Sequence, residues 1–156
     1  AILFYNEYGQ EYSHAKHVAI NNLVDDLLAK NVPIHGIGLQ MHTDINKLED
    51  RIKYAIRAAA SRNIQVHISE LDISVNPENE EGITFTDELA KEQQNLYRYV
   101  TQGMMEIPQQ FQFGITMWGV TDQYSWRYGS PDWVLPFSDK YERKPAYDGI
   151  LQGLYK

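Results

Sequence analysis

The sequence predicts an α/β fold in which parallel strands alternate with helices. Short apolar runs are followed by longer stretches with helical periodicity, which is the pattern of strand–helix units in a parallel sheet. No segment rich in Pro, Gly or Ser divides the chain, so residues 1–156 are expected to form one domain. The pattern repeats four times. Four units are half of an eight-stranded (β/α) barrel, which takes about 250 residues in full.

The expected elements follow one another without long gaps. Strands are expected at residues 2–5, 34–39, 64–71 and 111–118, and helices at 13–30, 44–63, 86–105 and 144–155. A stretch rich in Pro, Asn, Glu and Gly between residues 75 and 85 is expected to be an exposed loop. A half barrel would have two open sheet edges, which favour pairing with another chain.

The composition indicates a globular protein with a neutral substrate. Hydrophobic residues make up 43% of the chain, and its net charge is -7 without any Lys/Arg-rich block, which argues against a nucleic-acid partner. No apolar run approaches the roughly 20 residues of a membrane helix. The absence of cysteine excludes disulfides and thiolate metal sites but leaves the compartment open. Because the chain starts inside an expected buried strand and lacks a signal-peptide pattern, we expect truncation or processing.

Polar side chains gather where the expected strands end, which is where barrels of this type place their reactive groups. Glu70 and Asp72 end the third strand and, being two residues apart, are expected on the same side of it. Gln40 and His42 have the same spacing at the end of the second strand. Taken alone, His42 could equally be a structural histidine. Beside its neighbours, it could complete a chain of hydrogen bonds from Asp72 through His42 to Glu70.

A metal-dependent hydrolase is an alternative interpretation of the same segment. It would use His42, His67 and Asp72 as metal ligands. The alternation of a strand places His67 and Ser69 on the side opposite Glu70 and Asp72. Because His67 would then point away from the other two ligands, this alternative is disfavoured, and no metal or cofactor is expected.

Aromatic residues cluster after the fourth strand. Trp118 ends that strand and Trp126 lies in the following loop, with Tyr124, Tyr128 and Trp133 nearby. Flat aromatic rings stack on sugar rings, although a single Trp is as often part of a core. Their position beside two carboxylates favours Trp118 and Trp126 as a sugar-stacking platform.

Cleavage of a glycosidic bond needs two carboxylates, about 5–5.5 Å apart in retaining enzymes. Glu70 can be only one of them, and Asp72 is better placed to orient His42. Glu7 follows Asn6 and imitates the Asn–Glu pair of many sugar-cleaving barrels. However, only one expected strand lies between Glu7 and Glu70, whereas two strands separate the acid from the nucleophile in those barrels. The side chain of Glu7 is also expected on the side of the strand opposite Asn6. Glu7 is therefore expected to face the helices or solvent, and the general acid/base is expected to be absent.

The strand segments together resemble glycoside hydrolase family 10. LFYNEY matches strand five of that family, GIGLQMH strand six, HISELDI strand seven and ITMWGVTDQYSWR strand eight, and the tail 144–147 resembles its closing helix. The resemblance spans essentially the whole chain. It implies the C-terminal half, strands 5–8 with their helices, of a TIM (β/α)8 barrel. The implied activity is that of a retaining endo-β-1,4-xylanase that cleaves xylan or xylo-oligosaccharides and is secreted, extracellular or periplasmic.

The resemblance also implies roles for individual residues. Glu70 corresponds to the nucleophile, His42 to its hydrogen-bond partner and Asp72 to the residue behind His42. The implied substrate-binding residues are Gln40 near the reacting sugar, Trp118 and Trp126 on the glycone side, and Asn6 and Tyr8 on the leaving-group side.

The chain also departs from the family pattern. Ser69 replaces the usual Thr, and Gly9 removes a polar side chain from the loop after strand five. Strands one to four, which carry the acid/base, are not in the sequence. We therefore expect negligible activity from the chain alone, and association with the N-terminal half of the barrel or with a second copy. An inactive carbohydrate-binding or structural remnant is the alternative.

Overall fold

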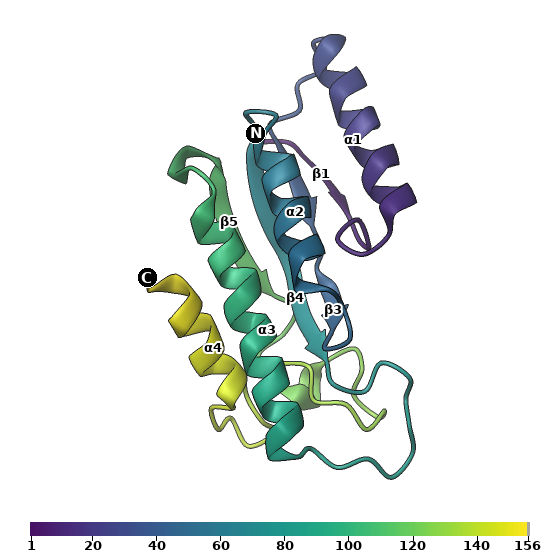
Figure 1. The fold of residues 1–156 in the computed structure, drawn as a ribbon, viewed down its shortest axis with the longest axis vertical. Helices are drawn as coiled ribbons and strands as arrows, with labels where there is room; N and C mark the ends of the chain where they lie inside the picture. The colour runs from purple at the N-terminus through teal and green to yellow at the C-terminus, as the bar shows by residue number, and fades with distance from the viewer. Residues whose placement is uncertain (156) are drawn as a thin grey trace.

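The computed structural model describes residues 1–155 and contains a parallel sheet with helices (Figure 1). The strands are β1 (Phe4–Glu7), β2 (Gly36–Leu39), β3 (His42–Asp44), β4 (Gln65–Ser74) and β5 (Gln112–Met117). The helices are α1 (His14–Ala29), α2 (Glu49–Ala60), α3 (Asp87–Glu106) and α4 (Pro145–Leu154). Strand β1 pairs with β2, and β4 pairs with β2, β3 and β5, all in parallel. The predicted alternation of strands and helices is confirmed.

Side chains at the helix starts satisfy free backbone N–H groups. The Ser13 side chain accepts from the Lys16 backbone N–H before α1, and the Thr86 side chain accepts from the Leu89 N–H before α3. The loop between β4 and α3 is expected from its composition and is found between Ser74 and Asp87. It lies at the end of the molecule that also holds the loops after β5 (Figure 1).

The strand predicted at residues 34–39 corresponds to β2, and the separate strand β3 follows it after a short interruption. The interruption falls at Gln40 and Met41, where Met41 adopts φ 64°, a left-handed conformation that is uncommon outside glycine. Met41 is fully buried in the core. The backbone around the interruption stays hydrogen-bonded, because Gln40 N–H donates to the Glu7 carbonyl and Glu70 N–H donates to the Gln40 carbonyl. The helix predicted from Asp44 begins later, because Asp44 ends β3, a turn follows it, and α2 starts at Glu49.

Helices α2 and α3 cover one face of the sheet (Figure 1). The core between them consists of buried apolar side chains from both layers. These include Ile37, Leu39, Ile56, Val66, Ile68, Leu71, Ile73, Tyr97 and Val100. The Tyr97 hydroxyl donates to the Val134 carbonyl at 2.6 Å, which connects α3 to the loop after β5.

A β-bulge in β4 interrupts the alternation of its side chains. Ser69 and Glu70 together stand opposite the single residue Thr116 of β5. Ile68 before the bulge and Leu71 after it are both buried in the core. Ser69 and Glu70 therefore both leave the core side and reach the same face of the sheet.

The face away from α2 and α3, called the open face below, carries Phe4, His67, Phe113 and Thr116. The Phe4 and Phe113 ring centroids are 4.7 Å apart, and those of His67 and Phe113 are 4.9 Å apart. His67 Nε2 lies 2.9 Å from the Thr116 hydroxyl. The prediction that the side chains of His67 and Ser69 point to the side opposite Glu70 and Asp72 is wrong. Because of the bulge, the residues before it and the residues after it direct these side chains to the same face of the sheet. Phe113 is 46% exposed, so an aromatic part of the open face is uncovered.

The first strand is displaced from its predicted position. It covers Phe4–Glu7 rather than residues 2–5, so Asn6 lies inside the strand and not after it. Ile2 and Leu3 are 56% and 48% exposed, and the Leu3 N–H donates to His35 Nδ1 instead of a strand partner. Within residues 1–155, no helix has the length and apolarity needed to cross a membrane.

Candidate active site

Glu70 lies where β4 nears its C-terminal end, and both of its carboxylate oxygens are held. Oε2 lies 3.2 Å from Nε2 of His42, and Oε1 accepts a hydrogen bond from Nδ2 of Asn6 at 3.0 Å. The Glu70 side chain is 15% exposed. Partners on β1 and β3 thus fix the orientation of this carboxylate from two sides while leaving part of it accessible.

His42 connects Glu70 to a buried carboxylate. Its Nδ1 lies 3.0 Å from Oδ2 of Asp72, with which it is in register across β3 and β4. The predicted chain of hydrogen bonds from Asp72 through His42 to Glu70 is confirmed. Burial lowers the pKa of His42, but hydrogen bonds and charges from Asp72 and Glu70 outweigh it and raise the pKa overall. The imidazole therefore retains a proton between the two carboxylates at higher pH than a free histidine.

Trp126 is a further partner of Asp72. Its indole Nε1 donates to Asp72 Oδ2 at 2.7 Å, the same oxygen that faces His42. Asp72 is only 2% exposed, so both contacts replace water around a buried charge. The sequence placed Trp126 beside the carboxylates but not in contact with one.

Asn6 is itself held in place by residues on two neighbouring strands. Its Oδ1 accepts a hydrogen bond from the Ser69 hydroxyl at 2.6 Å, which fixes the side-chain amide with Nδ2 toward Glu70. Gly38 lies beside it in β2, and a Cβ at that position would be 2.3 Å from Asn6 Oδ1. Gly38 therefore leaves the space that the Asn6 amide occupies. The place of Asn6 on the leaving-group side, which the resemblance implied, stays a prediction, and the structure adds its bond to Glu70.

Glu7 faces the helix layer, as predicted. Its Oε1 lies 3.1 Å from Nζ of Lys16 on α1. A hydrogen bond from the Tyr8 backbone N–H and the Lys16 ammonium lower the pKa of Glu7. It is thus a surface ion pair and not a second carboxylate beside Glu70.

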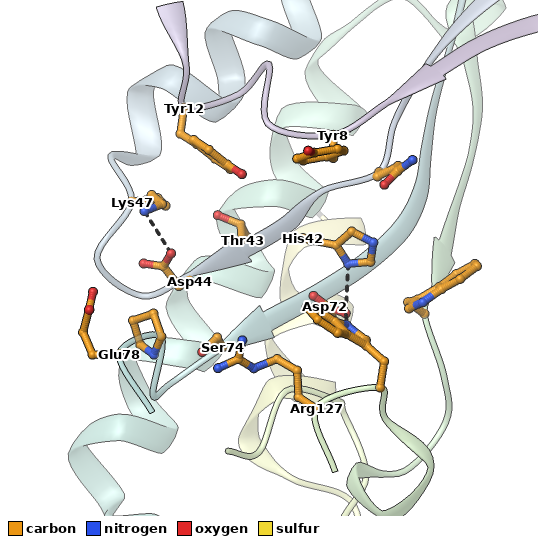
Figure 2. Close-up of a pocket in the computed structure, with 14 residues that line it drawn as sticks. Tyr8, Tyr12, His42, Thr43, Asp44, Lys47, Asp72, Ser74, Glu78 and Arg127 are labelled. Carbon is orange, nitrogen blue, oxygen red and sulfur yellow. Dashed lines mark hydrogen bonds and ion pairs between the residues drawn. The ribbon is translucent and has the colours of Figure 1, made fainter. Parts of the chain in front are cut away.

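A cleft of about 590 Å³ opens beside His42 and Asp72 (Figure 2). Its walls come from the loops after β1, β3, β4 and β5. Four of the predicted substrate-binding residues line it, namely Tyr8, Gln40, Trp118 and Trp126. Trp118 and Trp126 are 47% and 60% exposed, so their rings are available for stacking.

The other aromatic residues of the cluster lie elsewhere. Tyr124, Tyr128 and Trp133 are not among the described residues that line the cleft. Trp133 packs on Phe85, with ring centroids 5.4 Å apart. Within residues 1–155, no group of three or more His, Cys, Asp or Glu side chains is arranged to hold a metal ion.

A buried ion pair that sequence reasoning missed ties the cleft loops together. Asp132 accepts a hydrogen bond from Arg127 Nε at 2.6 Å and another from the Ser74 hydroxyl at 2.6 Å. The Asp132 side chain is fully buried. Arg127 directly follows Trp126, so this pair joins the Trp126 loop to the end of β4. In the sequence, the Arg127–Asp132 pair is indicated only by two opposite charges that lie close together in one loop.

Glu11 is a second residue that the sequence did not single out. It is 1% exposed, and neither carboxylate oxygen has a hydrogen-bond partner within the described residues. Burial raises the pKa of Glu11 to about 7, and nearby backbone N–H groups with the charges of His42 and Lys16 offset only part of the rise. Glu11 lies in the loop between β1 and α1 and directly precedes Tyr12, which lines the cleft.

Replacing Glu11 by Gln is expected to stabilise the protein at alkaline pH. The folded-state pKa of about 7 lies above the ordinary value of 4.5, so the folded chain binds the extra proton between these values. The free energy of unfolding therefore falls as pH rises through this window, by about 3 kcal/mol in total. Urea denaturation should show Glu11→Gln more stable than the native chain at pH 8 and equal to it at pH 4. Glu92→Gln, an exposed change on α3, is the control, and an identical pH dependence in all three proteins would contradict the assignment.

The fold and the site define one class of protein, half of an α/β barrel in which an imidazole holds a carboxylate and lies beside two exposed tryptophans. The family model described as glycosyl hydrolase family 10 matches residues 1–153. The chain belongs to this family. Its α/β fold of parallel strands corresponds to part of the TIM barrel of family xylanases, as predicted.

Several relatives are endo-1,4-beta-xylanases. The chain is 34% identical over 172 residues to endo-1,4-beta-xylanase A of Cellvibrio japonicus, covering 99% of the chain and 28% of the relative. It is 33% identical to the endo-1,4-beta-xylanase of Geobacillus stearothermophilus, covering 94% of the chain and 47% of the relative. The chain thus spans less than half the length of these two relatives.

Solved xylanase structures superpose closely. A thermostable mutant of a Cellvibrio japonicus xylanase matches with a TM-score of 0.91 and 32% identity, over 100% of this chain and 50% of that chain. A mutant of xylanase 10C from the same organism, in complex with xylopentaose, matches with a TM-score of 0.90 and 30% identity, over 99% of this chain and 34% of that chain.

Proposed function

We propose that this chain supplies the nucleophile of a retaining endo-β-1,4-xylanase. The observation that carries the proposal is the geometry of Glu70, which is held by Asn6 and His42 and remains partly exposed beside the aromatic cleft. A carboxylate in this setting can attack the anomeric carbon of a bound sugar. The xylanase relatives and the xylopentaose complex of one of them support xylan as the substrate.

The proposed reaction has two steps. Glu70 attacks the anomeric carbon and forms a covalent glycosyl–enzyme, while an acid from outside this chain protonates the leaving oxygen. Water activated by the same outside group then hydrolyses the intermediate. In both steps His42 and Asp72 orient the Glu70 carboxylate, and its partners stabilise the negative charge that returns when the ester breaks.

The remaining cleft residues are proposed to bind the sugar chain. Trp118 and Trp126 would stack on the glycone, Tyr8 would border the leaving-group side, and Gln40 would contact the reacting sugar; that all four line the cleft supports these roles. Secretion stays a prediction, since one similar solved structure is an intracellular xylanase of Thermoanaerobacterium saccharolyticum.

The open face is proposed to pack against the other half of a barrel. Its aromatic rings, Phe4 and Phe113, would otherwise stay partly in water, and within residues 1–155 β1 and β5 each pair with a strand on one side only. Analytical ultracentrifugation should show that the chain associates with a separately produced N-terminal half of a family xylanase, or with a second copy. A monomer that ignores added N-terminal half would contradict this proposal.

The same mixture tests the function. The chain alone should hydrolyse xylan negligibly, because it lacks a proton donor worth about 10² to 10⁴ in rate. Adding the N-terminal half should restore release of reducing sugar from xylan. If the mixture binds xylan but never cleaves it, the alternative of a carbohydrate-binding remnant is favoured, since the exposed tryptophans would suffice for binding.

Replacing Asn6 by Ala should slow xylan hydrolysis by the reassembled barrel. The change removes the hydrogen bond to Glu70 Oε1, and a hydrogen bond to a charged group contributes about 1.5–3 kcal/mol, which corresponds to about 10- to 100-fold in rate. Gly38→Ala should have a similar effect because its Cβ would displace the Asn6 amide. Steady-state rates of both variants are compared with Asn22→Ala on the exposed surface of α1. Rates equal to that control would contradict a role for Asn6.

A further inference from the structure

Tyr8 forms part of the cleft wall and directly follows β1. It lines the cleft on the same side as Tyr12 (Figure 2). Tyr8 is 52% exposed, so packing against the protein covers only about half of the residue. A half-exposed ring can turn about its side-chain bonds, and ordering such a ring during binding lowers the affinity for a ligand. Contacts that hold the Tyr8 ring before a ligand arrives would therefore strengthen binding.

Lys16 on α1 covers one face of the Tyr8 ring. Its Nζ lies 3.3 Å from the ring centroid, which is the geometry of a cation–π contact. Among the described residues, Tyr8 lines the cleft and Lys16 does not, so the ammonium lies behind the ring as seen from the cleft. A sugar in the cleft can then stack only on the opposite face of the ring.

The Glu7 carboxylate binds both members of this contact. Its Oε1 lies 3.1 Å from Lys16 Nζ and accepts a hydrogen bond from the backbone N–H of Tyr8 at 2.9 Å. One oxygen thus binds both the cation on the ring and the backbone that carries the ring. The Tyr8 N–H and the Lys16 ammonium lower the pKa of Glu7, so the carboxylate keeps its charge in mildly acidic solution.

The turn at Gly9 brings Lys16 back to Tyr8. Gly9 has φ 78°, a left-handed conformation that glycine adopts without strain. Its carbonyl accepts the N–H of Ser13 at 2.8 Å, and the Ser13 side chain accepts the N–H of Lys16. The first turn of α1 is therefore joined to the residue that follows Tyr8, which fixes the backbone from which the Lys16 side chain extends.

A surface ion pair without further contacts is the alternative interpretation of Lys16 and Glu7. Such pairs contribute little to stability, because solvent screens them. Lys30 and Asp26 at the other end of α1 form a pair of that kind, with both side chains more than half exposed. The Lys16 and Glu7 side chains are only 32% and 27% exposed, and both contact a residue of the cleft wall. The Lys30–Asp26 pair therefore provides a matched control.

We propose that Lys16 and Glu7 are positioning residues, which hold the Tyr8 ring in the orientation that stacks on the first sugar of the leaving group. The inference rests on the proposed function, which assigns Tyr8 to the leaving-group side. Lys16 and Glu7 act through the ring and not on the sugar itself. They order the ring before the substrate binds, so they affect binding of the leaving group and not the chemistry at Glu70.

Steady-state kinetics of the reassembled barrel with two substrates test the proposal. Xylotetraose places sugars on the leaving-group side, whereas β-xylobiosyl fluoride leaves that side empty because its leaving group is a single atom. Lys16→Met keeps the length of the side chain and removes its charge. We expect the KM for xylotetraose to rise about fivefold at unchanged kcat, the effect of one lost cation–π contact, with no change for the fluoride.

Three further variants separate the role of the contact from a general loss of structure. Lys16→Arg should restore most of the native KM, because a guanidinium also stacks on an aromatic face. Glu7→Gln should raise the KM less than Lys16→Met does, since the amide oxygen can still accept from the Tyr8 N–H. Lys30→Met breaks the Lys30–Asp26 pair and should leave the kinetics of both substrates unchanged.

NMR spectroscopy of the chain alone measures the contact independently of activity. Protons that lie over an aromatic ring are shifted upfield by the ring current. The ε-methylene protons of Lys16 should therefore resonate upfield of those of Lys30. Tyr8→Leu should abolish this difference, and Glu7→Gln should reduce it.

Each possible failure has its own meaning. Equal chemical shifts for Lys16 and Lys30 would overturn the inference whatever the activity, because the contact would not form. A native KM for xylotetraose in Lys16→Met, or an equal loss with both substrates, would reject the positioning role while the proposed function stands. A native barrel that cleaves neither substrate would reject the proposed function and the inference with it.

Discussion

Xylan hydrolysis by the reassembled barrel is expected to fall more than about 10⁴-fold when Glu70 is replaced by Ala or Gln, since removal of a nucleophile abolishes the covalent route. The Ala variant removes the carboxylate together with its contacts to Asn6 and His42. The Gln variant keeps the volume but cannot form a glycosyl ester. Agreement between the two variants would separate the loss of chemistry from a loss of packing.

The control for this experiment is a variant that loses the same charge as Glu70→Gln at a position away from the site. Glu92→Gln removes one negative charge from the exposed surface of α3 and should leave the rate unchanged. Reassembly is verified for each variant by sedimentation, because a chain that no longer pairs with its N-terminal half would also be inactive. Full activity in a reassembled Glu70→Ala barrel would reject Glu70 as the nucleophile.

Local patterns predicted the part of the site that depends on regular strands. Asp72 and His42 face each other across β3 and β4 in register, so the rule that residues two apart share a side sufficed to connect them to Glu70. The same rule failed at Ser69, because a bulge shifts the alternation there. Bulges depend on how two strands pair, and a single sequence carries little signal for that.

The contacts made by the loop after β5 could not be predicted from the sequence. Trp126 was predicted in the cleft from its position after a strand, but its bond to Asp72 depends on how the loop after β5 folds back. That folding is set by buried charges, Asp132 with Arg127 and Asp122 with Lys144. In the sequence these residues have the same appearance as solvated surface charges, since burial is a property of the folded chain.

The Lys144–Asp122 pair is the buried contact whose loss should destabilise the protein most. Nζ of Lys144 lies 2.8 Å from Asp122 Oδ2 and donates to the carbonyls of Trp133 and Leu135 at 2.8 and 2.7 Å. The side chains are 7% and 5% exposed. Burial lowers the pKa of Lys144 and raises that of Asp122, so each charge is unfavourable without the other.

Lys144→Met is therefore expected to lower the free energy of unfolding by about 3–5 kcal/mol, because it leaves a buried carboxylate unpaired. Urea denaturation at pH 7 measures the loss, and Lys140→Met, an exposed change in the same loop, is the control. Adding Asp122→Leu to Lys144→Met should recover much of the stability, since an apolar pair can replace a buried ion pair. The loss should also shrink at low pH, where Asp122 takes up a proton and the unpaired charge disappears. A loss below about 1 kcal/mol, typical of surface pairs, would show that the pair does not hold the Trp126 loop.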